Sequence, residues 1–470
     1  MRKVKYAILG AGTSGLTALG VIRKQTDDFV IINGGHYGTT CARVGCMPSK
    51  ALIYSANIYH KRHAFEEFGL SGSEAVTVNV PKVLERVRRL RDRFTTGVKS
   101  GTTEALKEGQ SIHGFAKFVA ENRLEVNGEI IEAERIIIAT GSRPVVPGPW
   151  LELGDLLHTS DTIFEQPSLP KSIAVIGLGV IGLEIGQAMA RLGVKVIGFE
   201  MQDKIGGLSV PEVNQQALEL MSKEFPIYTG EGAQIERKGD RVIVKNSQVE
   251  MEVDAVFASL GRRPNIDQLG LDKVGIQLDG RGIPTFNLNT MQIEDKPIFI
   301  AGDANVYRPI LHEAGYEGKM AALNAVSYPN VTAYRRKTPM GVAFTEPNIG
   351  LFGVSYRDLD FDKVEVVTFD LKRSNGRAIV MDEDDGVICL YADKQSKKLL
   401  GGEMIMPHAE HFAHLLNWAV ERDMTVADLM TMPFYHPVLE EAVQSVIQKL
   451  YYAVYPEDER SSSPELTVMQ

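Results

Sequence analysis

The chain has 470 residues, more than one compact core usually holds, so we expect several domains. Its net charge of −9 argues against nucleic acid or an anionic membrane surface as the main partner. Three cysteines are too few for the disulfide framework of a secreted protein. Glycines interrupt the apolar N-terminal segment, and no apolar run has the length of a membrane span, so we expect a cytoplasmic protein.

The first predicted element is a strand, turn and helix at residues 5–22, with the sequence KYAILGAGTSGLTALGVI. It carries the spacing Gly10-x-Gly12-x-x-Gly15, which is typical of the first βα turn of a dinucleotide site. These glycines permit a sharp turn and let the backbone approach a pyrophosphate at the helix N-terminus. The next strand pattern, FVIIN, ends at Asn33, where a ribose-binding carboxylate is expected.

Two of the three cysteines lie in the segment TTCARVGCMPSK at residues 39–50. Cys41 and Cys46 could form a metal clip, a structural disulfide or a redox pair. A disulfide between residues five apart requires a distorted helix start, which Gly45 and Pro48 permit. A helix N-terminus lowers the pKa of a thiol, and no second Cys/His pair with metal-ligand spacing follows. The redox interpretation is therefore favoured over the other two.

A second strand, turn and helix pattern occupies residues 171–200. It repeats the fingerprint with Gly177, Gly179 and Gly182, and its second strand ends at Glu200. A carboxylate there accepts hydrogen bonds from ribose hydroxyls and repels a 2′-phosphate, so this site is predicted to prefer NAD over NADP. Two such units predict two dinucleotides, commonly FAD and a nicotinamide cofactor.

Further sequence motifs follow one another along most of the chain. Further segments in order are RIIIATGSRP at 135–144, LGRRPN at 260–265, IFIAGDAN at 298–305, FTEPNIGLFG at 344–353 and FYHPVLEE at 434–441. With these motifs the chain resembles the class I pyridine nucleotide-disulfide oxidoreductases, and among them the dihydrolipoamide dehydrogenases most closely.

The resemblance implies an α/β fold with two Rossmann-like dinucleotide-binding domains, for FAD and NAD, and an α+β C-terminal dimerisation domain. The FAD domain is expected to be discontinuous, with residues 1–149 and 270–337 enclosing an NAD domain at 150–269. Residues 338–470 then form the dimerisation domain. The family also implies a homodimer whose active site is shared between subunits.

The resemblance implies separate roles for several positions. It implies that Cys41 is the interchange thiol that meets the substrate, and that Cys46 faces the flavin. Lys50 is expected beside the flavin, paired with Glu184, and Asp303 is expected to bond the ribityl chain. The remaining positions that the resemblance assigns to cofactor binding are Gly10, Gly12, Gly15, Asn33, Gly114, Thr140, Gly141, Gly177, Gly179, Gly182, Glu200, Gly261 and His312.

The last motif supplies an acid–base element. His436 precedes Pro437, which we expect to begin the final helix, and Glu441 lies five residues after the histidine. The resemblance implies a His–Glu dyad that reaches the cysteine pair of the other subunit. Histidine suits this role because imidazole titrates near neutral pH. The usual threonine after the proline is Val438, and a further histidine of the motif is replaced by Phe434.

The predicted reaction is oxidation of a dihydrolipoyl group, free or on a carrier domain, to lipoamide with NAD⁺ through Cys41 and Cys46. The alternative is an NAD(P)H-dependent reductase of another disulfide or of a quinone, and the non-enzymatic alternative is a flavoprotein redox sensor. His408, His411 and His414 recur every third residue and would drift around a helix, so no metal site is predicted.

Overall fold

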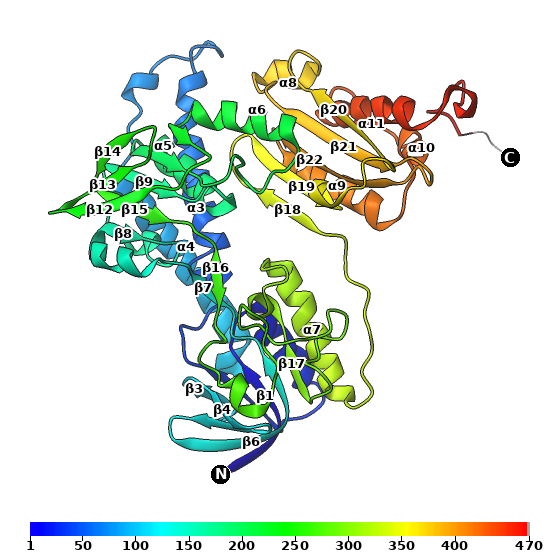
Figure 1. Ribbon diagram of the computed structural model, residues 1–470. Helices are drawn as coiled ribbons and strands as arrows, with labels where there is room; N and C mark the ends of the chain where they lie inside the picture. The colour runs from blue at the N-terminus through cyan, green and yellow to red at the C-terminus, as the bar shows by residue number, and fades with distance from the viewer. Residues whose placement is uncertain (468–470) are drawn as a thin grey trace.

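The structure is a computed structural model that describes residues 1–467. The chain has the α/β architecture expected, with two dinucleotide-binding units and an α+β C-terminal unit, each built on its own main sheet (Figure 1). Among residues 1–467, no helix combines the length and the apolar character needed to cross a bilayer.

The first unit is built on a seven-stranded sheet in the order β3-β2-β1-β6-β5-β4, with β17 added beside β6. Strands β1, β2, β3, β6 and β17 are parallel, and their apolar residues are buried on both faces of the sheet. Because β17 comes from much later in the chain, the unit is discontinuous. The strands are β1 (Arg2–Leu9), β2 (Phe29–Asn33), β3 (Ser111–His113), β4 (Lys117–Ala120), β5 (Arg123–Val126), β6 (Glu129–Ile138) and β17 (Ile298–Ile300).

Helices of the first unit connect its strands and extend towards the second unit. Helices α1 and α7 pack against each other, and α3 and α4 rise from the sheet towards the second unit (Figure 1). The helices are α1 (Thr13–Ile22), α2 (Thr40–Arg43), α3 (Cys46–His60), α4 (Val80–Gly101) and α7 (Leu311–Ser327).

The second unit has a five-stranded parallel sheet in the order β11-β10-β9-β15-β8, and a small antiparallel sheet of β12, β13 and β14 lies beside it. A two-stranded ribbon of β7 and β16 connects it to the first unit. Its helices are α5 (Val180–Arg191) and α6 (Pro211–Ser222). The strands are β7 (Ser142–Pro144), β8 (Leu157–His158), β9 (Ser172–Ile176), β10 (Lys195–Phe199), β11 (Ile227–Tyr228), β12 (Gln234–Lys238), β13 (Arg241–Lys245), β14 (Glu250–Val253), β15 (Ala255–Ala258) and β16 (Arg262–Pro264).

The C-terminal unit is a five-stranded antiparallel sheet in the order β18-β19-β22-β21-β20, with helices packed on it. The final helix begins at Glu440 and not at Pro437 as expected, because residues 437–439 form a turn before it. The elements are β18 (Met340–Ala343), β19 (Asn348–Gly353), β20 (Val364–Asp370), α8 (Gly376–Met381), β21 (Val387–Asp393), β22 (Leu399–Met406), α9 (Ala409–Glu421), α10 (Val426–Met430) and α11 (Glu440–Val454).

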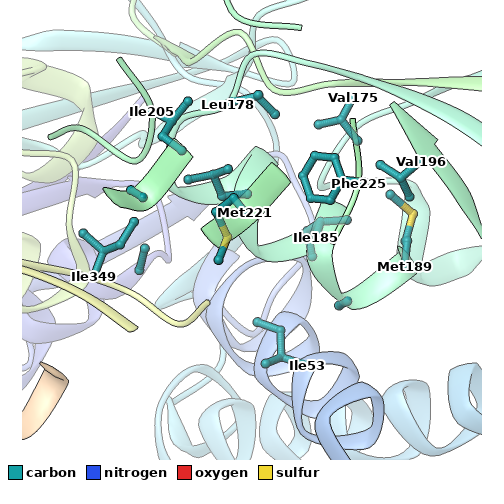
Figure 2. Close-up of a cluster of buried hydrophobic side chains, with 14 of the residues drawn as sticks. Ile53, Val175, Leu178, Ile185, Met189, Val196, Ile205, Met221, Phe225 and Ile349 are labelled. Atoms are coloured by element: carbon teal, nitrogen blue, oxygen red, sulfur yellow. The ribbon is translucent and has the colours of Figure 1, made fainter. Parts of the chain in front are cut away.

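One hydrophobic cluster joins all three units (Figure 2). Ile53 of α3 belongs to the same cluster as Ile185 and Met189 of α5, and Ile349 of β19 completes it from the C-terminal unit. Each fully buried side chain of this size contributes about 1.5–3 kcal/mol to folding. The shared core therefore holds α3 against α5 at the junction of the three units. This packing determines which side chains near the N-terminal ends of these two helices can contact each other.

Candidate functional site

The two glycine fingerprints form loops of the same design. Gly10 and Gly177 have positive φ angles of 108° and 91°. A Cβ on Gly15 would lie 1.9 Å from the Gly10 carbonyl oxygen, and the second loop repeats this 1.9 Å approach between Gly182 and Gly177. The middle glycines, Gly12 and Gly179, face open space and precede α1 and α5 without a side-chain cap. Both loops therefore present backbone N–H groups at a helix start that has no side-chain cap, which fits a pyrophosphate.

The side chain that follows the second strand differs between the units. The Asn33 Oδ1 atom accepts from the Ala11 N–H at 3.2 Å, and its Nδ2 donates to the Gly35 carbonyl at 2.7 Å. Glu200 accepts from the Leu178 N–H at 2.7 Å and from the Gln202 N–H at 3.0 Å. Each side chain thus ties its fingerprint loop to the following turn, but the first turn presents a carbonyl and the second an N–H.

A polar cavity of about 470 Å³ lies beside the end of β2. His36, Tyr37, Arg43, Lys99 and His113 are among its lining residues. The carboxyl ends of adjacent parallel strands are where open α/β sheets bind dinucleotides. The cavity therefore suits the adenosine half of FAD.

Other residues assigned to cofactors line the same edge of the first sheet. The Gly114 N–H donates to the Asn33 carbonyl at 3.1 Å, and Thr140 Oγ1 is buried without a hydrogen-bond partner within the described chain. Such an unpartnered hydroxyl fits a bound polar ligand. Asp303 accepts from Ser142 Oγ at 2.6 Å.

Three more predicted positions lie directly before two strands and at a helix start. Gly141 and Gly261 have positive φ angles of 68° and 88°, and they immediately precede β7 and β16 of the two-stranded ribbon. His312 lies in the first turn of α7, where burial lowers the pKa of its imidazole. Together with the open glycine loops, these residues fit the two dinucleotides predicted from the sequence.

The cysteine pair lies at a break between two helices. Cys41 belongs to the short α2, and Cys46 is the first residue of α3, with Gly45 between them making a 2.8 Å bond to the Thr40 carbonyl. Both cysteines are free thiols, and a hydrogen bond from Cys41 lowers the pKa of Cys46 to about 7. The nearby Lys50 ammonium acts in the same direction, whereas burial and the Glu184 carboxylate oppose it. The pKa of Cys41 is raised, chiefly by the same hydrogen bond and by burial.

Lys50 and Glu184 come together from different units. Lys50 lies in the second turn of α3, and its Nζ donates to Glu184 Oε2 at 2.7 Å. Glu184 is 4% exposed, and burying a carboxylate costs on the order of several kcal/mol unless it is paired and hydrogen-bonded. Its other oxygen accepts from the Phe344 N–H at 2.9 Å, and the Phe344 ring lies 4.4 Å from Lys50 Nζ. Sequence reasoning missed Phe344, although the FTEPN motif contains it.

The His436–Glu441 pair lies at the start of α11 in the C-terminal unit. His436 Nδ1 is 2.9 Å from Glu441 Oε1, and the other carboxylate oxygen of Glu441 accepts from the Val438 N–H at 3.1 Å. This bond to His436 holds the pKa of Glu441 below its usual value. The His436 side chain is 80% exposed within one chain. Its neighbour Tyr435 is 81% exposed.

The histidine-rich segment does not form one helical stripe. His408 precedes α9 with a left-handed backbone (φ 58°), so the assumption that all three histidines lie on a helix was wrong. Ligand atoms of His408, Glu410 and His411 lie within 4.8 Å of one another. The two histidines are exposed at the positive end of α9, which disfavours a bound cation, and we assign no metal to them.

A family model described as pyridine nucleotide-disulphide oxidoreductase matches residues 4–327, and the dimerisation domain of the same family matches residues 340–447. The chain belongs to this family. Pyridine nucleotide-disulphide oxidoreductases use FAD and NAD(H), and the matched dimerisation domain supports a homodimer.

Curated relatives of this oxidoreductase match over nearly the whole chain. The dihydrolipoyl dehydrogenase of Geobacillus stearothermophilus is 30% identical over 454 residues, which cover 92% of this chain and 93% of that protein. The dihydrolipoyl dehydrogenase of Halobacterium salinarum is 31% identical over 469 residues, which cover 94% of this chain and 95% of that protein.

Two solved structures share the fold of this oxidoreductase. The Cu(II) complex of the HOCl-induced flavoprotein disulfide reductase RclA from Escherichia coli aligns with a TM-score of 0.83 at 19% identity, covering 96% of this chain and 100% of that one. LpdA from Mycobacterium tuberculosis aligns with a TM-score of 0.81 at 22% identity, with the same coverage. At these identities the likeness concerns the fold alone.

Proposed function

We propose that this oxidoreductase oxidises a dithiol of the dihydrolipoyl type with NAD⁺, in the cytoplasm, using Cys41 and Cys46 as its redox pair. The observation that carries the proposal is the contact between two thiols of opposite pKa shift at the break between α2 and α3, beside Lys50 and Glu184. Relatives about 30% identical to this chain are named dihydrolipoyl dehydrogenases, and this supports the choice of substrate.

The reaction would begin with the pair oxidised to a disulfide. His436 of the partner subunit removes a proton from one substrate thiol, and the resulting thiolate attacks Cys41 Sγ. The Cys41–Cys46 bond breaks, and Cys46 leaves as a thiolate, which its low pKa and the Lys50 ammonium stabilise. The second substrate thiol then attacks the mixed disulfide and breaks its bond to Cys41, and the proton of that thiol passes to Cys41, so the products are the oxidised substrate and the Cys41 thiol.

Each side chain has a defined task in this scheme. Glu441 orients His436 through the 2.9 Å contact and stabilises its charged form. Glu184 holds Lys50 at the junction of the units. Bound FAD would carry the two electrons from the cysteine pair to NAD⁺, which becomes NADH. Glu200 would hold the adenosine ribose of NAD⁺.

Steady-state assays with dihydrolipoamide and NAD⁺, compared with NADH-dependent reduction of glutathione disulfide and quinones, test the proposal. We expect dihydrolipoamide oxidation to have the highest kcat/KM. His436→Ala should lower it by about 10²–10⁴-fold yet leave NADH oxidation by artificial acceptors unchanged. Glu440→Ala, beside the dyad, is the matched control. A flavin-containing protein with no thiol-dependent turnover would instead support the redox-sensor alternative.

The second candidate is an NADH-dependent reductase of another disulfide or of a quinone. It is favoured by the apolar replacements around the dyad, Phe434 and Val438, together with the exposed ring of Tyr435. Such a surface suits a bulky apolar acceptor better than an amide-linked lipoyl arm. A higher kcat/KM for a quinone than for dihydrolipoamide in the same assays would select this candidate.

A further inference from the structure

The Phe344 side chain lies where the three units meet. It immediately follows β18 of the C-terminal unit, and its backbone N–H donates to Glu184 of the second unit. Its ring covers the ammonium of Lys50 from the first unit at 4.4 Å. Phe344 therefore makes separate backbone and side-chain contacts to the two members of one ion pair.

We propose that Phe344 is a positioning residue that holds the Lys50 ammonium near Cys46 through its aromatic ring. The inference rests on the proposed function, because it assigns the Cys46 thiolate a role there. It extends the redox site to the C-terminal unit of the same chain, in addition to the dyad of the partner subunit.

The electrostatics explain why an aromatic ring suits this position. Glu184 binds Lys50 at 2.7 Å, but its negative charge also opposes the thiolate form of Cys46. A phenyl ring attracts a cation through its quadrupole and has no net charge. The ring can therefore restrain the ammonium without cancelling its field at Cys46.

The titratable groups that face Cys46 come from three elements. Cys41 lies on α2, Lys50 on α3 and Glu184 on α5, and Phe344 contacts the last two. Lys50 also reaches Ser49 Oγ at 3.4 Å. Loss of the ring would leave Lys50 with the carboxylate and one weak hydroxyl contact, so its ammonium would spend less time near Cys46.

The test uses the FAD-containing enzyme with Cys41→Ser as the background, since a serine hydroxyl still donates to Cys46. The only other thiol, Cys389, is fully buried, and burial strongly raises its pKa, so Cys46 alone titrates near neutral pH. The ultraviolet absorbance of the thiolate, followed against pH, reports this titration without requiring turnover or a flavin contact. Phe344→Leu removes the ring but keeps the backbone bond to Glu184.

We expect Phe344→Leu to lower the thiolate-to-thiol ratio of Cys46 at neutral pH by about two- to fivefold, the range of a modest cation–π contact. Phe344→Tyr should restore the ratio, because it keeps an aromatic face. The matched control is Phe369→Leu, a partly buried phenylalanine of β20 that packs in another core and should leave the ratio unchanged.

A double-mutant cycle with Lys50→Met separates positioning from general packing. If the ring acts through the ammonium, Phe344→Leu should have no effect on Cys46 once Lys50 is replaced. An equal effect in both backgrounds, or no effect in either, would overturn the proposal. If the double-mutant cycle gives the expected result but the enzyme does not oxidise dihydrolipoamide, only the proposed substrate is overturned.

Discussion

The two dinucleotide units have matching glycine loops but opposite polarity in the turn beyond the second strand. In the first unit, the turn presents the Gly35 carbonyl, and Asn33 satisfies it with an amide donor. In the second unit, the turn presents the Gln202 N–H, and Glu200 satisfies it with a carboxylate acceptor. The backbone around each loop therefore determines which side chain fits at the end of the second strand. This requirement is separate from the side chain that the ribose favours there.

The units also differ in what they contribute to the chemistry. The chain leaving β2 runs directly into α2 and α3, which bear both redox cysteines and Lys50. The second unit contributes one carboxylate, Glu184, from its fingerprint helix. Variants in each unit can therefore separate thiol chemistry from nucleotide binding.

The largest expected effect comes from Cys46→Ser in the first unit. Removing the leaving thiolate should lower dithiol oxidation by at least about 10³-fold, while the Kd for NADH in the second unit stays unchanged. Assays of turnover and titration of NADH fluorescence measure the two effects. Cys389→Ala, which removes the buried thiol of β21, is the control. A comparable loss of NADH affinity would contradict the division of labour between the units.

Glu200→Gln tests the second unit in the complementary way. The amide would place an N–H₂ group against an N–H group of the loop or the turn, and it would remove the charge that binds the ribose. We expect the Kd for NAD⁺ to rise by about 10- to 100-fold, the range of a lost charged hydrogen bond. FAD content should not change. Glu236→Gln, an exposed carboxylate of β12, is the control, and an unchanged Kd in Glu200→Gln would refute the assignment.

How far the sequence predicts these features depends on how local each one is. The glycine spacing specifies the loops because the turn and the close approach involve neighbouring residues. The contact of Phe344 with Lys50 depends on how three units pack, and no local pattern encodes it. The bond from Asn33 to Gly35 depends on the orientation of one peptide group, and the left-handed backbone at His408 is equally invisible to helical periodicity. The family motifs gave the fold class and the pairing of distant positions only by resemblance.

The pH dependence of the Cys46 thiol tests how the charge of Lys50 from the first unit and that of Glu184 from the second unit together set its pKa. Its pKa of about 7 is below that of a free thiol, so the thiolate predominates above that pH and is lost as the pH falls. In the reduced enzyme, alkylation of Cys46 should slow about tenfold per pH unit below the midpoint. Mass spectrometry of the modified peptide measures the rate. Lys50→Met should raise the midpoint, whereas Lys61→Met, on the exposed end of the same segment, should not.

The smallest expected effect comes from Asn33→Asp, which tests most directly whether the side chain is matched to the polarity of its turn. Asn33→Asp supplies the carboxylate that the fingerprint usually carries, so the ribose alone would favour it. The structure predicts the opposite, because one aspartate oxygen would face the Gly35 carbonyl where the Asn33 amide now donates at 2.7 Å. Losing one hydrogen bond of about 1 kcal/mol should raise the Kd for FAD by about fivefold, measured by flavin release on ultrafiltration.

The control for this variant is Asn246→Asp in the second unit. The Asn246 side chain accepts from the Gln248 and Val249 N–H groups and donates to no residue of the described chain, so a carboxylate can replace it. Tighter FAD binding by Asn33→Asp would mean that the ribose contact outweighs the turn. Asn33 would then be a weakened form of the usual carboxylate. Weaker binding would mean that the side chain is matched to its own turn, and that the two units differ because their backbones differ.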